Sequence, residues 1–235
     1  MLILSMDSSA KPASVAVCND NILLGQYFQN SGHTHSRTLL SMTEDLLKNL
    51  DLKISDIDLI AVSQGPGSFT GIRIGVSAVK GLAWGSDKPV CGVSALEAMA
   101  MQTKQTDAII CSVMDARRDQ VYNALFTWKE DKLIRLCDDR AISLEDLTLE
   151  LKNKTAPIYL IGDGAELTFD YFSNTSISCK LAPMLLRFQT AYGVALAAMQ
   201  TKPTNATDLE ATYLRPSQAE RERLGRAKQA PPTAP

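Results

Sequence analysis

Short apolar runs separated by polar turns open the chain. Residues 2–6 and 13–18 are almost wholly apolar or β-branched, and Asn19-Asp20-Asn21 then leads into a third apolar run over residues 22–28. Runs of this length, bounded by turn residues, are typical of β-strands, and the tight turn joins the last two as a hairpin. The first segment therefore predicts three strands.

Helical spacing follows over residues 36–49. With Leu39 at zero on a helical wheel, six further positions fall within one arc of roughly 160°. These positions are Leu40, Met42, Thr43, Leu46, Leu47 and Leu50. The arc is wider than contact with one neighbour requires, so this helix has apolar surface to spare.

Strands and helices alternate in the next segment. An apolar run over residues 57–62, interrupted only by Asp58, predicts a strand, and the glycine-rich stretch that starts at Gly65 leads into a helix ending near Trp84. A strand over residues 89–93 and a helix from Ser94 follow. Strand, helix, strand, helix implies parallel pairing through right-handed crossovers.

The pattern restarts near residue 108. Each copy opens with an apolar strand that ends in Met-Asp, at Met6-Asp7 and at Met114-Asp115, and continues through a polar turn into a second strand. In the second copy we expect a third strand over residues 132–137, a helix near 144–151, a strand over 157–161 and a helix near 186–199. Two β-β-β-α-β-α units predict duplicated α/β lobes that face each other across a cleft.

These patterns divide the chain into a first lobe over residues 1–105 and a second over 106–217, whose last helix packs back on the first. Residues 218–235 are charged and then rich in Ala and Pro, which predicts a disordered tail.

The composition of the chain narrows the partners and the compartment that we expect for it. The net charge of −2 gives no global basic field that would attract nucleic acid. Five cysteines without a CxxC pair predict reduced thiols in a cytoplasmic protein. We expect no contact with a membrane, because no apolar run is long enough to span one, and we interpret the first apolar run as a strand and not as a signal peptide.

Several sequence blocks together resemble the TsaB (YeaZ) family of the actin-like ATPase and sugar-kinase superfamily. The blocks are MDSS with ASVAV, HS before the first helix, GPGSFTGIRIG, VMDARRDQVY, IGDGA and ATYLRP. They spread over nearly the whole chain before the predicted tail, and GPGSFTGIRIG is the most specific of them. The resemblance implies two actin-like, ribonuclease H-like lobes with mixed sheets flanked by helices.

The resemblance also implies a function. TsaB is required for threonylcarbamoyladenosine (t6A) at position 37 of tRNAs reading ANN codons. It resembles TsaD, the enzyme that transfers the threonylcarbamoyl group, and is expected to be a non-catalytic paralogue of it. TsaE, an ATPase, is the third member. No catalytic residue is therefore expected in this chain.

The phosphate-binding hairpins of the superfamily are degenerate here. Glycine lets a backbone approach a phosphate closely, yet neither Asp7-Ser8-Ser9-Ala10-Lys11-Pro12 nor Asp115-Ala116-Arg117-Arg118 contains one. IGDGA looks like a shortened adenosine-binding turn. Asp7, Ser8 and Ser9 are candidate cofactor-binding residues of this degenerate loop, but we favour Asp7 as the cap of the turn. The alternative function is an ATP-dependent phosphotransferase or ATPase, with Asp7 and Asp115 around Mg²⁺.

The two histidines allow two interpretations. In an extended segment His33 and His35 would point the same way, but no residue with recognisable spacing supplies a third metal ligand. We favour an ordering role for them in the loop, with Ser36 as the helix N-cap. A zinc-dependent peptidase is a weaker alternative, since the chain has no HExxH motif.

GPGSFTGIRIG matches neither a P-loop nor a dinucleotide fingerprint. One face of this helix consists mostly of small residues. On a helical wheel with Gly71 at zero, the others fall within roughly 40° on either side: Gly75, Ala78, Leu82 and Gly85. A glycine in a helix interior costs roughly 0.5–1 kcal/mol relative to alanine. The small face therefore predicts close approach of a second helix, while an adjacent aliphatic stripe covers the sheet.

That second helix is either the chain's own helix over residues 36–49 or one from a partner. The resemblance favours pairing with TsaD through the first-lobe helices as a four-helix contact. The predicted interface is Leu39, Leu40, Thr43, Leu46, Leu47, Gly71, Gly75, Ala78 and Leu82. Without TsaD the same surface could form a homodimer. We expect tRNA to be bound indirectly, through the complex. No cofactor is required, although the resemblance allows ATP or ADP at the partner interface.

Overall fold

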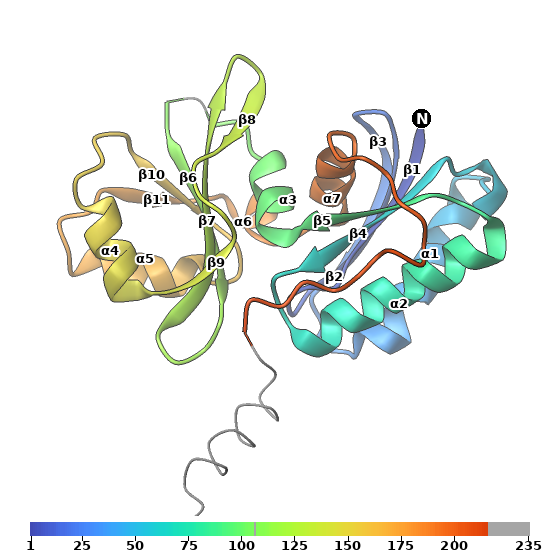
Figure 1. Cartoon of the computed structure of the whole chain (residues 1–235), viewed down its shortest axis with the longest axis horizontal. Coiled ribbons are helices and arrows are strands. Elements are labelled where there is room, and N and C mark those ends of the chain that lie inside the picture. Colours follow the sequence, from blue (N-terminus) through green and yellow to red (C-terminus); the bar gives the residue numbers. More distant parts are fainter. Residues whose placement is uncertain (106, 216–235) are drawn as a thin grey trace, which may run out of the picture.

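The computed structural model describes residues 1–105 and 107–215. Within them, two β-sheets flanked by helices lie end to end (Figure 1). The first sheet has the order β3-β2-β1-β4-β5, in which β1 pairs antiparallel with β2 and parallel with β4. Its strands are β1 (Leu2–Asp7), β2 (Ala13–Asn19), β3 (Ile22–Gln29), β4 (Leu59–Gly65) and β5 (Val90–Ser94).

The second sheet repeats this arrangement around β6. It has the order β11-β10-β6-β7-β8, with β9 paired to β7, and β6 lies antiparallel to β7 and parallel to β10. Its strands are β6 (Ile109–Asp115), β7 (Gln120–Lys129), β8 (Lys132–Arg135), β9 (Arg140–Ser143), β10 (Ile158–Ile161) and β11 (Cys179–Leu181). The predicted α/β class, with two mixed sheets of duplicated topology, is confirmed.

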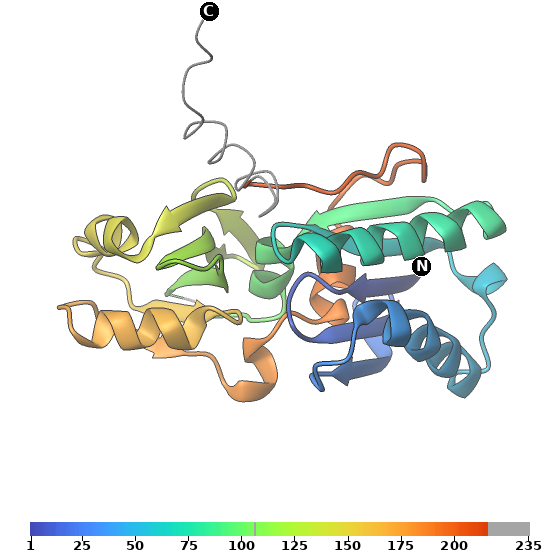
Figure 2. The same ribbon diagram turned by 90° about the horizontal axis from the view of Figure 1, so that it is seen from below.

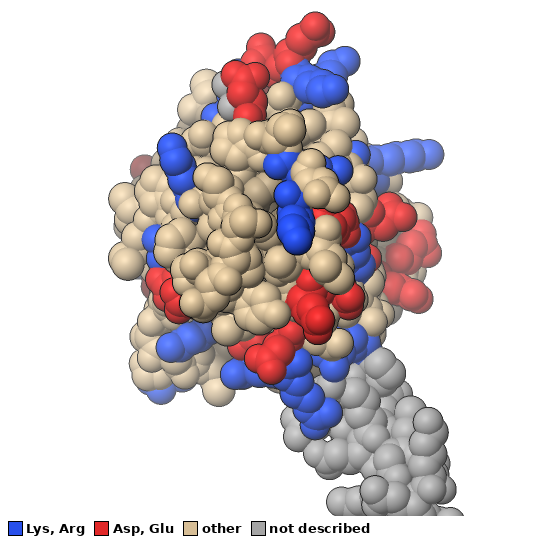
Figure 3. Space-filling view, turned by 90° about the vertical axis from the view of Figure 1, so that its left-hand side faces the viewer, with Lys and Arg blue, Asp and Glu red and all other residues tan. Residues whose placement is uncertain are grey.

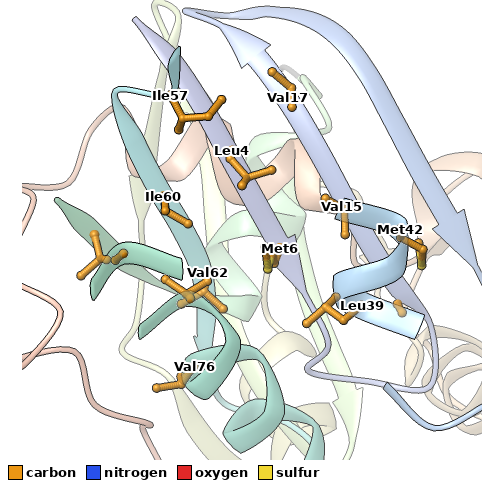
Figure 4. Close-up of a cluster of buried hydrophobic side chains, with 14 of the residues drawn as sticks. Leu4, Met6, Val15, Val17, Leu39, Met42, Ile57, Ile60, Val62 and Val76 are labelled. Atoms are coloured by element: carbon orange, nitrogen blue, oxygen red, sulfur yellow. The ribbon is translucent and has the colours of Figure 1, made fainter. Parts of the chain in front are cut away.

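The alternation of side chains along the first sheet separates two cores. On one face, α1 (His35–Asn49) and α2 (Phe69–Ser86) pack against side chains such as Leu4 and Val62. Figure 4 shows Leu39, Met42 and Val76 from these helices lying over the same strands. On the other face, α3 (Ala95–Met101) and α7 (Ala191–Ala198) cover alternate residues of the same strands.

Helix α3 also covers one face of the second sheet, so it lies between the two lobes. The opposite face of that sheet packs on α4 (Leu144–Leu151) and α5 (Ala165–Ser173). Two short elements, η1 (Ile54–Asp56) and α6 (Met184–Arg187), complete the described helices. At the outer end of the second lobe both signs of charge surround an uncharged area (Figure 3).

After α7, which already packs on the first sheet, the chain continues along the first lobe. Thr204 pairs with Val90 of β5, the Lys80 ammonium donates to the Thr207 and Leu209 carbonyls, and the Thr212 N–H donates to the Gln64 carbonyl. We call residues 200–215 the C-terminal strap. It follows α2 back to the edge where both β-hairpins turn (Figure 1).

Three features of the structure differ from what the sequence predicted. The predicted helix over 186–199 is two helices, because the Thr190 hydroxyl caps α7 by accepting from the Gly193 N–H. Elements β9, α5 and β11 were not predicted. The N-cap of α1 is Thr34, so Ser36 lies inside the helix. The predicted tail over 218–235 lies outside the described residues, and the lobe boundaries stay a prediction.

The described residues include no helix that is both long enough and apolar enough to cross a membrane.

Candidate functional site

A cavity of about 600 Å³ lies where the two hairpins meet the start of α2. The first hairpin contributes Ser9 and Lys11, the second contributes Asp115 and Arg117, and the strap contributes Tyr213. The loop before α1 and the first turn of α2 close the remaining sides. Parts of MDSS, GPGSFTG, MDAR, GDG and ATYLRP, which are far apart in the sequence, thus meet at one cavity.

Asp7 shapes the first hairpin from inside. It is 1% exposed, and its Oδ1 accepts hydrogen bonds from the Ser9 N–H at 2.9 Å and the Ser9 hydroxyl at 2.8 Å. These bonds confirm the predicted turn-capping role. Among the described residues Oδ2 has no hydrogen-bond partner, and burial raises the pKa of the Asp7 carboxyl although the bonds from Ser9 oppose this rise.

The serines of the first hairpin face the chain's own helix. Both are fully buried, the Ser8 hydroxyl donates to the Gly71 carbonyl at 2.9 Å, and the Ser68 N–H donates to the Ser9 carbonyl at 2.6 Å. A Cβ on Gly71 would lie 2.0 Å from the Ser8 carbonyl oxygen. The first hairpin and α2 are therefore packed backbone to backbone, and both hydroxyls are engaged within the chain.

The second hairpin has the same cap and a different exterior. The Asp115 carboxylate accepts from the Arg117 N–H at 2.7 Å, as Asp7 does from Ser9. Arg117, Arg118 and Asp119 have φ values of 66°, 58° and 53°, in the left-handed region. The Arg117 side chain is 86% exposed and forms a long ion pair of 3.6 Å with Asp115.

Asp163 makes the interior of the cavity acidic. It belongs to the IGDGA turn, and its Oδ1 accepts from the Gln189 amide at 2.8 Å. Burial raises the pKa of Asp163 to about 6, and the nearby carboxylates of Asp115 and Asp7 add to the rise. A Cβ on Gly162 would lie 1.9 Å from the Val113 carbonyl oxygen, so this glycine serves the packing of the turn on β6.

The histidines lie at the cavity wall. His35 starts α1, and its Nε2 lies 3.3 Å from the Lys11 carbonyl oxygen. His33 is exposed in the preceding loop. Within residues 1–105 and 107–215, no three His, Cys, Asp or Glu side chains converge as metal ligands would.

The structure divides the predicted partner interface into two sets. One set faces inward, because the helical wheel could not say which part of the wide arc covers the sheet. Leu39, Thr43 and Leu46 are at most 3% exposed in the first core, and Gly71 and Gly75 are buried against Ser8. These five are not available to a partner. The set that reaches the surface is Leu40, Leu47, Ala78 and Leu82.

Further small residues of α2 point outward, next to the predicted set. A Cβ on Gly81 or Gly85 would have no described atom within 4 Å, and the Trp84 side chain is 82% exposed. Gly81 and Trp84 were missed in the sequence, although a wheel centred on Gly81 would have grouped them. Figure 2 shows α1 and α2 side by side at the surface. We define the α1/α2 face as Leu40, Leu47, Ile74, Ala78, Gly81, Leu82, Trp84 and Gly85.

An aromatic cluster joins the strap to α2. The Arg73 guanidinium lies 3.9 Å from the Phe69 ring centroid, its Nε donates to the Tyr213 hydroxyl at 2.9 Å, and the two rings are 4.4 Å apart. A Cβ on Gly65 would meet the Thr212 carbonyl oxygen at 2.3 Å. The GPGSFTGIRIG and ATYLRP blocks therefore contact each other, which their separation in sequence concealed.

Comparisons with known proteins give a TsaD family model and relatives named TsaB. The family model "TsaD: tRNA N6-adenosine threonylcarbamoyltransferase" matches residues 28–212. The "tRNA threonylcarbamoyladenosine biosynthesis protein TsaB" of Bacillus subtilis (strain 168) is 34% identical over 167 residues, which are 71% of this chain and 73% of that protein. The protein of the same name from Haemophilus influenzae is 27% identical over 238 residues, 92% and 94% of the two chains.

Solved structures agree with the fold. "YeaZ from Pseudomonas aeruginosa" superposes with a TM-score of 0.77 and 23% identity, over 91% of this chain and 99% of that one. The ethanolamine utilization protein EutJ of Carboxydothermus hydrogenoformans has a TM-score of 0.50 and 12% identity, over 84% and 90% of the two chains. At these identities the two likenesses show the fold alone.

Proposed function

This chain belongs to the TsaB family, and from that membership we propose that it is a non-catalytic subunit that binds TsaD in the formation of t6A on tRNA. The observation that carries the proposal is the exposed α1/α2 face. Helix-interior glycines such as Gly81 cost roughly 0.5–1 kcal/mol relative to alanine. Since nothing described in the chain packs against Gly81 or Gly85, contact with another helix is what would offset this cost.

TsaD fits this face by its similarity to the chain. The TsaD family model matches residues 28–212, which include both α1 and α2. A relative with an equivalent helix pair could complete a four-helix contact, and the exposed Trp84 is the kind of large aromatic side chain that anchors interfaces. In the absence of TsaD, two copies of this face could pair across a two-fold axis.

Two features support a role without catalysis. The hydroxyls of Ser8 and Ser9 are engaged within the chain, and the second hairpin offers arginine side chains in place of a glycine backbone. Neither hairpin resembles a cradle for transferable phosphate. TsaE and tRNA would join through the complex, and ATP or ADP at the interface with TsaD remains part of the proposal, with no cofactor required by the chain itself.

Single arginine substitutions test the face. We expect Leu40→Arg and Gly81→Arg to fold normally, because both positions are exposed, and to lose co-purification with TsaD. The matched control is Leu149→Arg on α4, where an exposed leucine (63%) lies on the other lobe. Reconstituted tRNA modification should fall with the first two variants and persist with the control. Undiminished TsaD binding by folded Leu40→Arg and Gly81→Arg would overturn the proposal.

A further inference from the structure

Basic side chains gather at the rim of the cavity, although the chain as a whole is slightly acidic. Lys11, Arg117 and Arg215 line the cavity from three different segments, and Arg118 lies beside them in the second hairpin. The Arg215 guanidinium donates to the Ala116 carbonyl at 2.8 Å, which fixes the end of the strap on that hairpin. We propose that this rim binds the backbone of unpaired RNA directly. The inference rests on the proposed function, since it names a contact with the tRNA substrate, and it adds a direct contact by this chain to the binding expected through the complex.

The second hairpin holds its arginines in a strained conformation. Every other non-glycine residue with positive φ in the described part of the chain is Asp or Glu. Asp tolerates the left-handed region because its short side chain bonds locally, whereas arginine gains no such compensation. Strained backbone conformations of this kind cluster at functional sites. The turn itself would be satisfied by glycine, so its geometry does not explain two consecutive arginines.

The charge distribution favours a strand across the rim over a nucleotide inside the cavity. The cavity lining includes the largely buried Asp163 and the partly exposed Asp115, and these carboxylates oppose the phosphates of a buried nucleotide. Two of the cations reach solvent: the Arg117 side chain is 86% exposed, and Lys11 is also exposed. An extended polyanion can contact several such cations while it stays clear of the acidic interior.

Aromatic rings beside the cations favour RNA with unpaired bases. Tyr122 and Tyr213 line the same cavity, and Tyr213 is 38% exposed. Bases in single-stranded loops stack on rings of this kind, while the phosphates contact Arg and Lys. The strap end and the β6–β7 hairpin, which carry these groups, lie at the same edge of the molecule (Figure 1).

A glycine double variant separates binding from folding. Arg117→Gly/Arg118→Gly removes both charges, and glycine adopts the left-handed turn freely, so the fold is retained. The probe is a fluorescent RNA stem-loop with a seven-base loop, titrated with the full-length chain at several salt concentrations. We expect the variant to bind roughly tenfold or more weakly, with the slope of log K against log salt smaller by about 1.5.

The matched control is Lys152→Ala/Lys180→Ala, which removes two exposed charges from the outer part of the second lobe and should leave the affinity unchanged. Arg117→Lys/Arg118→Lys should restore most of the binding. Equal affinity and slope in wild type and glycine variant, or wild type that binds Mg-ATP but not the stem-loop, would overturn the proposal. Co-purification with TsaD should be unaffected by the glycine variant, so a failure here is distinct from a failure of the α1/α2 face.

Discussion

The two hairpins occupy equivalent places in the duplicated topology, and they differ in almost everything but their first residue. Each begins with an aspartate whose carboxylate accepts from the backbone N–H two residues later, at 2.9 Å in the first and 2.7 Å in the second. The first hairpin is then buried against the glycines of α2. The second is exposed, and three of its residues are left-handed.

This difference shows two ways in which one structural position can lose a phosphate cradle. The first hairpin has become part of the core, so its residues now contribute to stability. The second has kept an open exterior and replaced backbone donors by long cationic side chains. Substitutions of the buried Asp7, Ser8 and Ser9 in the first hairpin should therefore change folding, and substitutions of the exposed arginines in the second should change binding.

The largest effect is expected where α2 meets the first hairpin. In Gly71→Ala the new methyl would lie 2.0 Å from the Ser8 carbonyl oxygen, which is backbone and cannot move aside cheaply. We expect the free energy of unfolding to fall by about 3 kcal/mol. Gly81→Ala in the same helix meets no described atom and should raise it by roughly 0.5–1 kcal/mol. Denaturant unfolding of both measures the pair, and equal effects would contradict the close packing of the first hairpin.

A smaller effect on the free energy of unfolding is expected at Asp163, the largely buried carboxyl near the second hairpin. The pKa of Asp163 is raised to about 6 when folded, so the folded state binds more protons than the unfolded state between about pH 4 and pH 6. Stability from this group is fully present below pH 4 and is lost as pH rises through 6. Asp163→Asn keeps an acceptor for the Gln189 amide and should gain about 2 kcal/mol at pH 7.

The measurement is the difference in unfolding free energy between wild type and Asp163→Asn at pH 4, 5, 6 and 7. This difference should grow with pH up to about 6 and then level off. A constant difference over that range would show that the Asp163 carboxyl is not perturbed by burial.

Much of the fold followed from the sequence because it depends on local pattern. Strand β1, helix α1 and the repeat around Met114-Asp115 were predicted from apolar spacing and from turn residues. The break between α6 and α7 was missed, since apolar residues lie on both sides of it. The residues that separate the two helices are fixed by the Thr190 cap and the buried Gln189. Such a break depends on tertiary contacts that spacing does not record.

The candidate site was less predictable, because its parts come from distant segments. Asp7 was correctly interpreted as a turn cap, since an aspartate at that position bonds locally. Gly71 and Gly75 were correctly seen as close-approach positions, but they were assigned to a partner helix when their neighbour is Ser8. The contact of Phe69 and Arg73 with Tyr213 joins segments 140 residues apart, and no local pattern encodes it.

The smallest effect is expected when one residue of each hairpin is replaced by glycine, which compares the two hairpins directly. Arg117→Gly relieves a left-handed arginine and should raise the free energy of unfolding by about 1 kcal/mol. Lys11→Gly in the first hairpin relieves nothing, because Lys11 is not among the described residues with positive φ, and it should lower stability by roughly 0.5–1 kcal/mol through the added freedom of the unfolded chain. Thermal and denaturant unfolding give both values. If the two changes in unfolding free energy have opposite signs, the second hairpin retains Arg117 at a cost to folding, as a binding role requires. If both variants lose stability, Arg117 contributes to the fold, and the two hairpins differ in exposure alone.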